Sequence, residues 1–171
     1  MRSAITAVFL ALTIFSTSAG QYFLNLAGIN GEVTIPAFKN QIEIHSIQFG
    51  LAYTEATGGG GGGAGKVNFS EITLTKPLDR ASPLLMLNCA KGAHFPTATF
   101  TAVETVSGTN RIYYEIALKE VLITSVSLNG SGGERPTESI ALSFASIEWK
   151  YRMTDGTQVT AGWDLKLNKE L

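Results

Sequence analysis

A single short helix constrains the fold of this chain more than any other feature. The stretch Thr75–Gly92 holds the one convincing helical pattern in an otherwise strand-rich sequence. We expect Ser82 to be its N-cap, because the hydroxyl can accept a hydrogen bond from an amide of the first turn. Pro83 suits the first helical position, and Gly92 can take the left-handed conformation that ends a helix. A helix of about two turns is too short to be stable alone, so it must pack on a sheet.

Four consecutive apolar residues of this helix are expected to supply its packing surface: Leu84, Leu85, Met86 and Leu87. The helix also carries the single cysteine of the chain, Cys89. One cysteine excludes an internal disulfide and a cysteine-built metal site. We interpret Cys89 as a small buried apolar residue, with a reactive thiol as the alternative.

Alternating apolar residues predict about eight strands around this helix. The eight longer ones cover residues 21–27, 41–54, 67–74, 97–106, 112–118, 121–128, 138–151 and 159–167, and a further short strand is expected to end at Pro36. Asp155 and Gly156 are typical of a hairpin turn between the last two strands.

Three of these strands contain one irregular step in the apolar pattern. The step runs from Ile44 to Ile47, from Phe69 to Ile72 and from Phe144 to Ile147. One extra residue in a strand is typical of a β-bulge, which bends the strand as barrel closure requires. The alternative is that each step separates two shorter strands. We expect a mainly β fold, an antiparallel β-barrel of two sheets with one short α-helix on its side.

Six consecutive glycines, from Gly58 to Gly63, interrupt the strand pattern between Tyr53 and Val67. Such a run is too flexible to form regular structure. It matches most of a phosphate-binding loop and of a dinucleotide-binding motif. However, Val67 stands where the magnesium-binding hydroxyl belongs, and a strand follows where a phosphate-binding helix should begin. No nucleotide cofactor is therefore expected.

The composition narrows the choice of function class. The 171 residues are enough for one domain with a sizeable core. The formal net charge is −1, and the charged residues, 16% of the chain, form no basic block. Nucleic acid is therefore not an expected partner, because its phosphates require a positively charged stripe.

Residues 1–19 have the pattern of a secretory signal peptide. Arg2 gives a short positive start, Ala4 to Phe15 is an uncharged apolar run, and Thr17 and Ala19 suit a signal peptidase. The run is too short for a comfortable membrane span, so no membrane contact is expected after its removal. A mis-chosen start codon or a weak membrane tether are the alternatives. We expect residues 20–171 to form the folded domain, located in the periplasm or outside the cell.

The sequence contains no convincing catalytic, metal-binding or cofactor-binding site. His45 and His94 each lack a second ligand at metal spacing, and Cys89 lacks an obvious base. Asp79 and Arg80 are interpreted as polar residues at the helix start and a possible ion pair. The remaining carboxylates of interest are dispersed along strands, as on solvated faces: Glu43, Glu55, Glu71 and Glu148.

Seven segments, in order and spacing, give the chain a specific resemblance to the Hcp family (haemolysin-coregulated protein) of the bacterial type VI secretion system. The matching segments are YFLNLAGINGE at 22–32, QIEIHSIQFG at 41–50, KVNFSEITLTK at 66–76, LDRASPLLMLNCAKG at 78–92, LKEVLITSVS at 118–127, GGERPTESIALSF at 132–144 and GWDLKLNK at 162–169.

The resemblance implies a barrel with a helix on one side and no enzymatic activity. It also implies a homo-oligomer, in which six subunits form a ring, rings stack into a tube, and the lumen carries effector proteins. The loop from about Leu51 to Lys66, with Tyr53, Gly58 and Gly63, would reach the neighbouring ring. In such proteins the subunit is cytoplasmic before type VI export, together with the other components of the system.

Three hypotheses follow. The first is a structural ring or tube subunit of type VI secretion. The second is an exported relative that acts as a periplasmic or secreted ring or binding module, motivated by residues 1–19. The third is an enzyme, for which His45, His94 and Cys89 are the only candidates.

Overall fold

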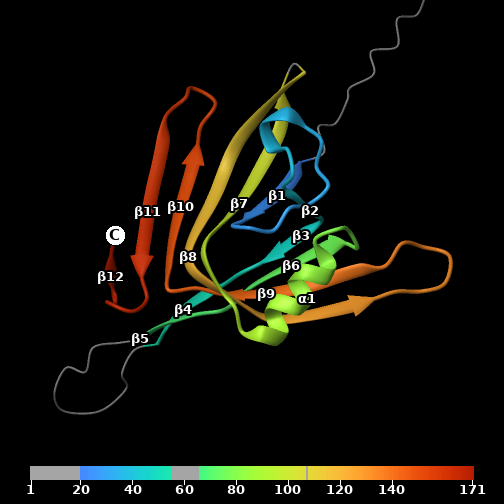
Figure 1. The fold of residues 1–171 in the computed structure, drawn as a ribbon. Helices are drawn as coiled ribbons and strands as arrows, with labels where there is room; N and C mark the ends of the chain where they lie inside the picture. Colours follow the sequence, from blue (N-terminus) through green and yellow to red (C-terminus); the bar gives the residue numbers. More distant parts are fainter. Residues whose placement is uncertain (1–19, 55–65, 107) are drawn as a thin grey trace, which may run out of the picture.

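A computed structural model describes residues 20–54, 66–106 and 108–171 of the chain (Figure 1). The expected leader, residues 1–19, lies outside this described part. The described elements are strands β1 (Gln21–Leu26), β2 (Ile42–Ile44), β3 (Ser46–Gln48), β4 (Leu51–Thr54), β5 (Lys66–Phe69), β6 (Ile72–Pro77), β7 (His94–Val106), β8 (Thr109–Asn129), β9 (Thr137–Ser143), β10 (Ser146–Arg152), β11 (Gln158–Asp164) and β12 (Lys169–Glu170), the 3₁₀ turn η1 (Pro36–Phe38) and the helix α1 (Ser82–Lys91).

The strands form one large antiparallel sheet and a separate pair, β4–β5. Hydrogen-bonded neighbours follow one another as β3–β6–β9–β8–β7–β1–β2, and β10, β11 and β12 branch from β8. The described strands β2 and β3 at the two ends do not pair with each other. They are consecutive, and the backbone amide of His45 between them donates to the Thr75 carbonyl of β6 at 2.7 Å. The mainly β, antiparallel fold with one helix is confirmed, although strand pairing alone does not close the expected barrel.

All three irregular steps in the apolar pattern are breaks between strands. At the first step β2 pairs with β1, whereas β3 pairs with β6. At the third step β9 pairs with β6 and β8, and after Ala145 the chain continues as β10 beside β8 and β11. The bulge interpretation was wrong here, because each extra residue lets the chain change its partner strand. Register shifts occur instead at Ala102/Val103 and Ile123/Ser125.

The helix ends as the sequence predicts. Gly92 is left-handed with φ 59°, and its N–H donates to the Cys89 carbonyl at 3.0 Å. The packing surface differs from the prediction, because Leu85 is fully buried whereas Leu84, Met86 and Leu87 are exposed. A helix lying on a sheet buries only one side, and four consecutive residues cannot all face it.

The core lies between the inner face of the sheet and this helix. Its buried residues alternate along the strands, as in Leu24 and Leu26 of β1 or Ile140 and Leu142 of β9. A second, smaller cluster joins Phe23, Phe38 and Val103, with the two phenylalanine rings stacked at 4.7 Å. The short strand expected before Pro36 is instead an irregular segment that leads into η1. Within the described part of the chain, no helix has the length and apolar character of a membrane span.

Candidate assembly surface and buried charge network

The β4–β5 hairpin projects from the body of the molecule, and we call it the arm (Figure 1). Its register places Leu51 opposite Phe69, and Tyr53 opposite Val67. Residues directly opposite each other in an antiparallel pair share a face, so these four side chains form one apolar face of the arm. Lys66 pairs with Thr54 at the end of the described hairpin. Gly58 and Gly63, predicted to belong to the same loop, lie outside the described residues.

Aromatic side chains hold the base of the arm. The Phe69 ring stacks on the Trp149 ring with centroids 6.5 Å apart, and it meets Phe144 edge-on at the same distance. Phe49, just before the arm, lies 6.1 Å from Phe144 and 6.4 Å from Trp149. The direction of the arm is therefore fixed by packing against Phe144, which precedes β10, and against Trp149 within β10.

Beyond this base the arm is exposed. Leu51 is 54% exposed and Tyr53 is 64% exposed. An isolated two-stranded hairpin is at best marginally stable in water, and it gains stability when its apolar face is covered. An exposed apolar hairpin face is typical of a surface that binds another protein.

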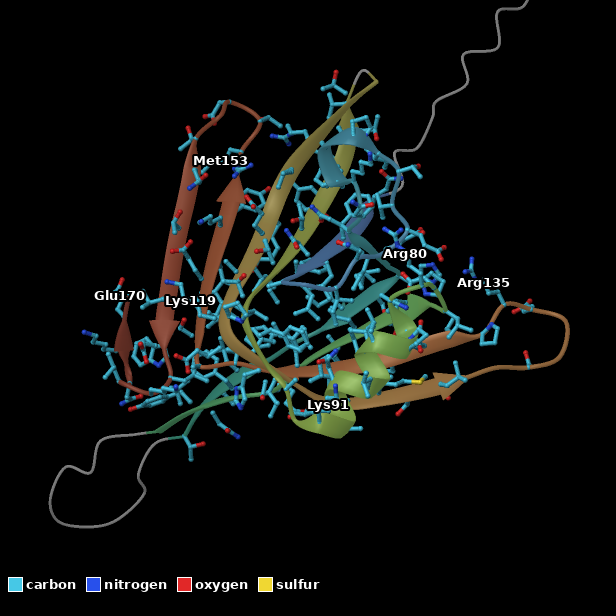
Figure 2. All side chains as sticks on the ribbon, in the orientation of Figure 1. Arg80, Lys91, Lys119, Arg135, Met153 and Glu170 are labelled. Atoms are coloured by element: carbon cyan, nitrogen blue, oxygen red, sulfur yellow. The ribbon has the colours of Figure 1, made fainter. Side chains whose placement is uncertain are left out.

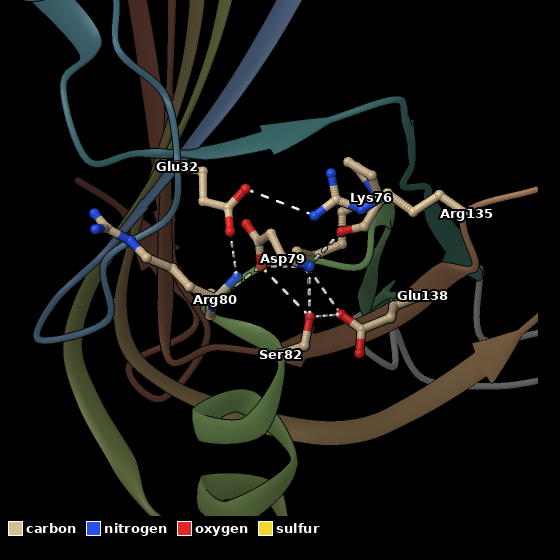
Figure 3. A network of polar contacts seen from close by, with 9 residues as sticks. Glu32, Lys76, Asp79, Arg80, Ser82, Arg135 and Glu138 are labelled. Atoms are coloured by element: carbon tan, nitrogen blue, oxygen red, sulfur yellow. Dashed lines mark hydrogen bonds and ion pairs between the residues drawn. The ribbon is translucent and has the colours of Figure 1, made fainter.

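A buried charge network lies where the helix begins (Figure 3). Lys76 of β6 and Glu138 of β9 face each other across the strand pair, and both side chains are fully buried. Lys76 Nζ lies 2.8 Å from Glu138 Oε2 and 2.8 Å from Asp79 Oδ1. The ammonium also donates to the Pro77 carbonyl at 2.7 Å. Hydrogen bonds of this kind offset part of the cost of burying an ion pair, although Glu138 Oε1 is buried without a hydrogen-bond partner.

Ser82 belongs to this network and is not the N-cap that the sequence predicts. Ala81 takes the N-cap position, and its carbonyl accepts the first helical hydrogen bonds from Leu84 and Leu85. The Ser82 hydroxyl instead donates to Glu138 Oε2 at 2.6 Å and accepts from Lys76 Nζ at 3.1 Å. Pro83 stands in the first turn, one position later than expected.

Asp79 and Arg80 do not form the ion pair that was considered. The Asp79 carboxylate binds Lys76 and accepts from the Ala81 amide at 2.9 Å. Arg80 reaches the segment between β1 and η1, because its backbone amide donates to Glu32 Oε1 at 3.0 Å. Arg135 lies 3.6 Å from the other oxygen of Glu32. The network thus ties the helix start to the N-terminal segment and to the β8–β9 loop (Figure 3).

The sequence carries a signal for this network in the apolar alternation of β6 and β9. Ile72 and Leu74 alternate on the buried face of β6, and Lys76 continues the same alternation. Glu138 precedes Ile140 and Leu142 in the same way on β9. A charged residue that extends a buried alternation on each of two strands predicts a buried pair if the strands are neighbours.

The candidate reactive residues are not brought together. His45 is exposed between β2 and β3, His94 is the exposed first residue of β7, and Cys89 is half-buried against the core. Among the described residues, no three His, Cys, Asp or Glu side chains are grouped to hold a metal ion. Glu43 and Glu71 are exposed, Glu148 pairs with Lys150 at 2.6 Å, and Glu55 lies outside the described residues.

Two tyrosines of β8 and one aspartate of the β10–β11 turn have shifted pKa values. Burial raises the pKa of the Tyr113 phenol, with further contributions from Tyr22 and Glu104, and burial alone raises that of Tyr114. Both phenols therefore stay neutral at neutral pH. In the β10–β11 turn, the Thr157 amide donates to the Asp155 carboxylate at 2.8 Å and lowers the pKa of that exposed group.

Comparison with known proteins places this geometry in one family. The family model described as "Type VI secretion system effector, Hcp" matches residues 23–151. Protein hcp1 of Pseudomonas aeruginosa is 40% identical over 111 residues, which cover 60% of this chain and 68% of that protein.

Solved structures agree with these sequence matches. The crystal structure of Hcp1 from Salmonella typhimurium superposes with a TM-score of 0.77 at 32% identity, covering 90% of this chain and 99% of that one. A type VI secretion system effector from Yersinia pestis superposes with a TM-score of 0.70 at 27% identity, covering 84% and 98%. The chain belongs to the Hcp family of type VI secretion system proteins.

Proposed function

We propose that this protein is a structural subunit that assembles into six-membered rings, which stack into the tube of a type VI secretion system. Family membership makes the chain a structural component of that system and not an enzyme. The observation that carries the proposal is the arm, whose apolar residues Leu51 and Tyr53 are exposed in the single subunit. In this function the ring lumen carries effector proteins.

The arm is the proposed contact between rings. Its base is fixed by Phe69 and Trp149, so the exposed part is presented in one direction. Tyr53 and Lys66 flank the loop that carries Gly58 and Gly63, and this loop would meet the neighbouring ring. Covering Tyr53 in that contact removes apolar surface from water, which stabilises the stack by about 25 cal/mol per Å² of apolar surface buried.

The oligomeric state of the purified full chain tests this function. Multi-angle light scattering and negative-stain electron microscopy should show closed six-membered rings, and short stacks should appear as the concentration rises. A strict monomer at the highest concentration reached would contradict the proposal.

Residues 1–19 are proposed to act as an export signal, and residues 20–171 as the folded domain. The support is the positive start, the apolar run from Ala4 to Phe15 and the small residues that follow it. A fusion of residues 1–25 to a reporter that is active only in the periplasm tests this. Activity that depends on the apolar run supports the proposal, and a reporter that stays cytoplasmic overturns it.

A further inference from the structure

A groove of about 400 Å³ lies between the first residues of β8 and the β10–β11 turn. The two strands pair only between Tyr114 and Lys119 of β8, so they separate beyond that point. Ile112 and Met153 supply the apolar part of the lining, and Arg111 and Arg152 supply the charged part. Met153 is 39% exposed, so the groove is open to a side chain from outside.

The two guanidinium groups of the groove are held in place. Arg111 pairs with Glu104 and donates from Nη1 to the Met153 carbonyl at 2.8 Å. Arg152 Nη2 lies 2.6 Å from Glu115 Oε2. Fixed guanidinium groups and a methionine are favourable neighbours for an aromatic ring, through cation–π, stacking and sulfur–aromatic contacts. Because Glu104 and Glu115 balance the two charges, the surface left for a partner consists of the flat guanidinium groups and the Met153 side chain, which suits packing against an aromatic ring.

The groove and the arm lie at opposite ends of the molecule. Figure 2 places Met153 at the end of β10 that points away from the arm. An arm at one end can meet a groove at the other end only in a second copy, and such a head-to-tail contact builds either a closed ring or an open stack. One end offers Tyr53, a 64% exposed aromatic residue, and the other offers a groove suited to an aromatic ring.

We infer that Tyr53 of one copy inserts into the groove formed by Ile112, Met153, Arg111 and Arg152 of a second copy in the next ring. This inference rests on the proposed function and adds the surface that receives the arm. The phenol ring packs between Ile112 and Met153, and the guanidinium groups lie against its face. Each subunit then donates one tyrosine and receives another, which propagates the stack.

Disulfide trapping in the full chain tests the contact. The double variant Tyr53→Cys/Met153→Cys, made with Cys89→Ser, carries one thiol at each end. Under mild oxidation it should give a ladder of covalent species on a non-reducing gel. The matched control is Asn68→Cys/Met153→Cys, because Asn68 is exposed on the opposite face of the arm. The control should give no ladder, and Tyr53→Cys alone can give at most dimers.

The outcomes separate this inference from the proposed function. A ladder from the 53/153 pair and none from the 68/153 pair supports it. Rings without a 53/153 ladder overturn the assigned groove and leave the ring function standing. Equal ladders from both pairs overturn it as well, since the groove would then contact both faces of the arm equally. A chain that stays monomeric overturns both the groove and the ring.

A second measurement uses substitutions without cysteine. Met153→Asp places a charge in the groove, and Val106→Asp places one on the end of β7, where Val106 is 49% exposed but does not line the groove. Electron microscopy should show single rings for Met153→Asp and stacked rings for Val106→Asp. Stacks that survive Met153→Asp, or that are lost equally in both variants, contradict the inference.

Discussion

The network around Lys76 buries charged groups, whereas the arm exposes apolar side chains. Each therefore departs from the usual arrangement of apolar residues inside and charged residues outside. The network buries an ammonium group and two carboxylates, Asp79 and Glu138, next to the core. The arm exposes Leu51 and Tyr53 to water. The charges of the network find their partners within the subunit, whereas the apolar side chains of the arm do not. The comparison assigns the network to folding and the arm to assembly.

The two regions should therefore fail in different ways when they are altered. Removing a buried partner leaves an uncompensated charge inside the folded chain, which lowers its stability. Removing an exposed apolar residue changes stability little, because the folded subunit hardly uses it. The substitutions below test this division, starting with the largest expected loss of folding free energy.

Glu138→Ala should cost about 3–5 kcal/mol of the free energy of unfolding, since it removes one partner of a fully buried pair. Urea or guanidinium unfolding followed by tryptophan fluorescence measures the loss. Glu148→Ala is the control, because Glu148 pairs with Lys150 at the partly exposed surface, where such pairs contribute about 0–1 kcal/mol. A loss below about 1 kcal/mol in Glu138→Ala would mean that the network does not support the fold.

Ser82→Ala should cost about 1–3 kcal/mol, because Lys76 and Glu138 both lose a buried hydrogen bond. A simple helix cap would give a loss of about 1 kcal/mol that is independent of Glu138. The double variant Ser82→Ala/Glu138→Ala distinguishes the two roles, since residues that share a network do not have additive effects. If the losses of the two single variants add up to that of the double variant within about 0.5 kcal/mol, Ser82 acts as a simple cap.

Lys76→Met/Glu138→Leu should lower the free energy of unfolding less than Glu138→Ala does, because it removes both members of the fully buried pair and leaves only Asp79 without its ammonium partner. Replacing both members of a buried pair by apolar side chains of similar size is often neutral or stabilising. Asp79 then keeps its hydrogen bond to the Ala81 amide but loses its ammonium partner. Chemical denaturation of the double variant beside the two single variants measures this. A double variant as unstable as Glu138→Ala alone would show that the charges themselves are needed.

The two regions also differ in how far the sequence could predict them. The helix stop at Gly92 needs only local backbone geometry, and it was predicted correctly. The irregular steps in the strands could not be resolved, because a bulge and a break give the same apolar spacing. Only the partner decides between them, as when the Ala145 amide donates to the Lys119 carbonyl and the chain leaves β9.

Long-range partners explain the remaining differences. The hydroxyl of Ser82 fits a cap in local sequence, but Glu138, 56 residues away, takes it instead. Lys76 and Glu138 extend buried alternations, so their burial could be predicted once β6 and β9 were known to be neighbours. The arm was expected from the glycine run and the family resemblance, whereas its aromatic base depends on Trp149 of β10, which no local pattern reveals.

Tyr53→Ser should change the stability of the subunit least among these variants. It also tests most directly whether the arm serves assembly. Because Tyr53 is 64% exposed in the subunit, the free energy of unfolding should change by no more than about 0.5 kcal/mol. Phe69→Ser in the same hairpin is the matched comparison, because the Phe69 ring packs on Trp149 and Phe144 and its loss should destabilise the subunit. Thermal unfolding and electron microscopy of both variants measure stability and stacking on the same samples. Tyr53→Ser should keep its melting temperature and its rings and lose the stacks. If it instead lowered the melting temperature as much as Phe69→Ser does, Tyr53 would belong to the fold of the subunit, and the division between a folding network and an assembly arm would fail.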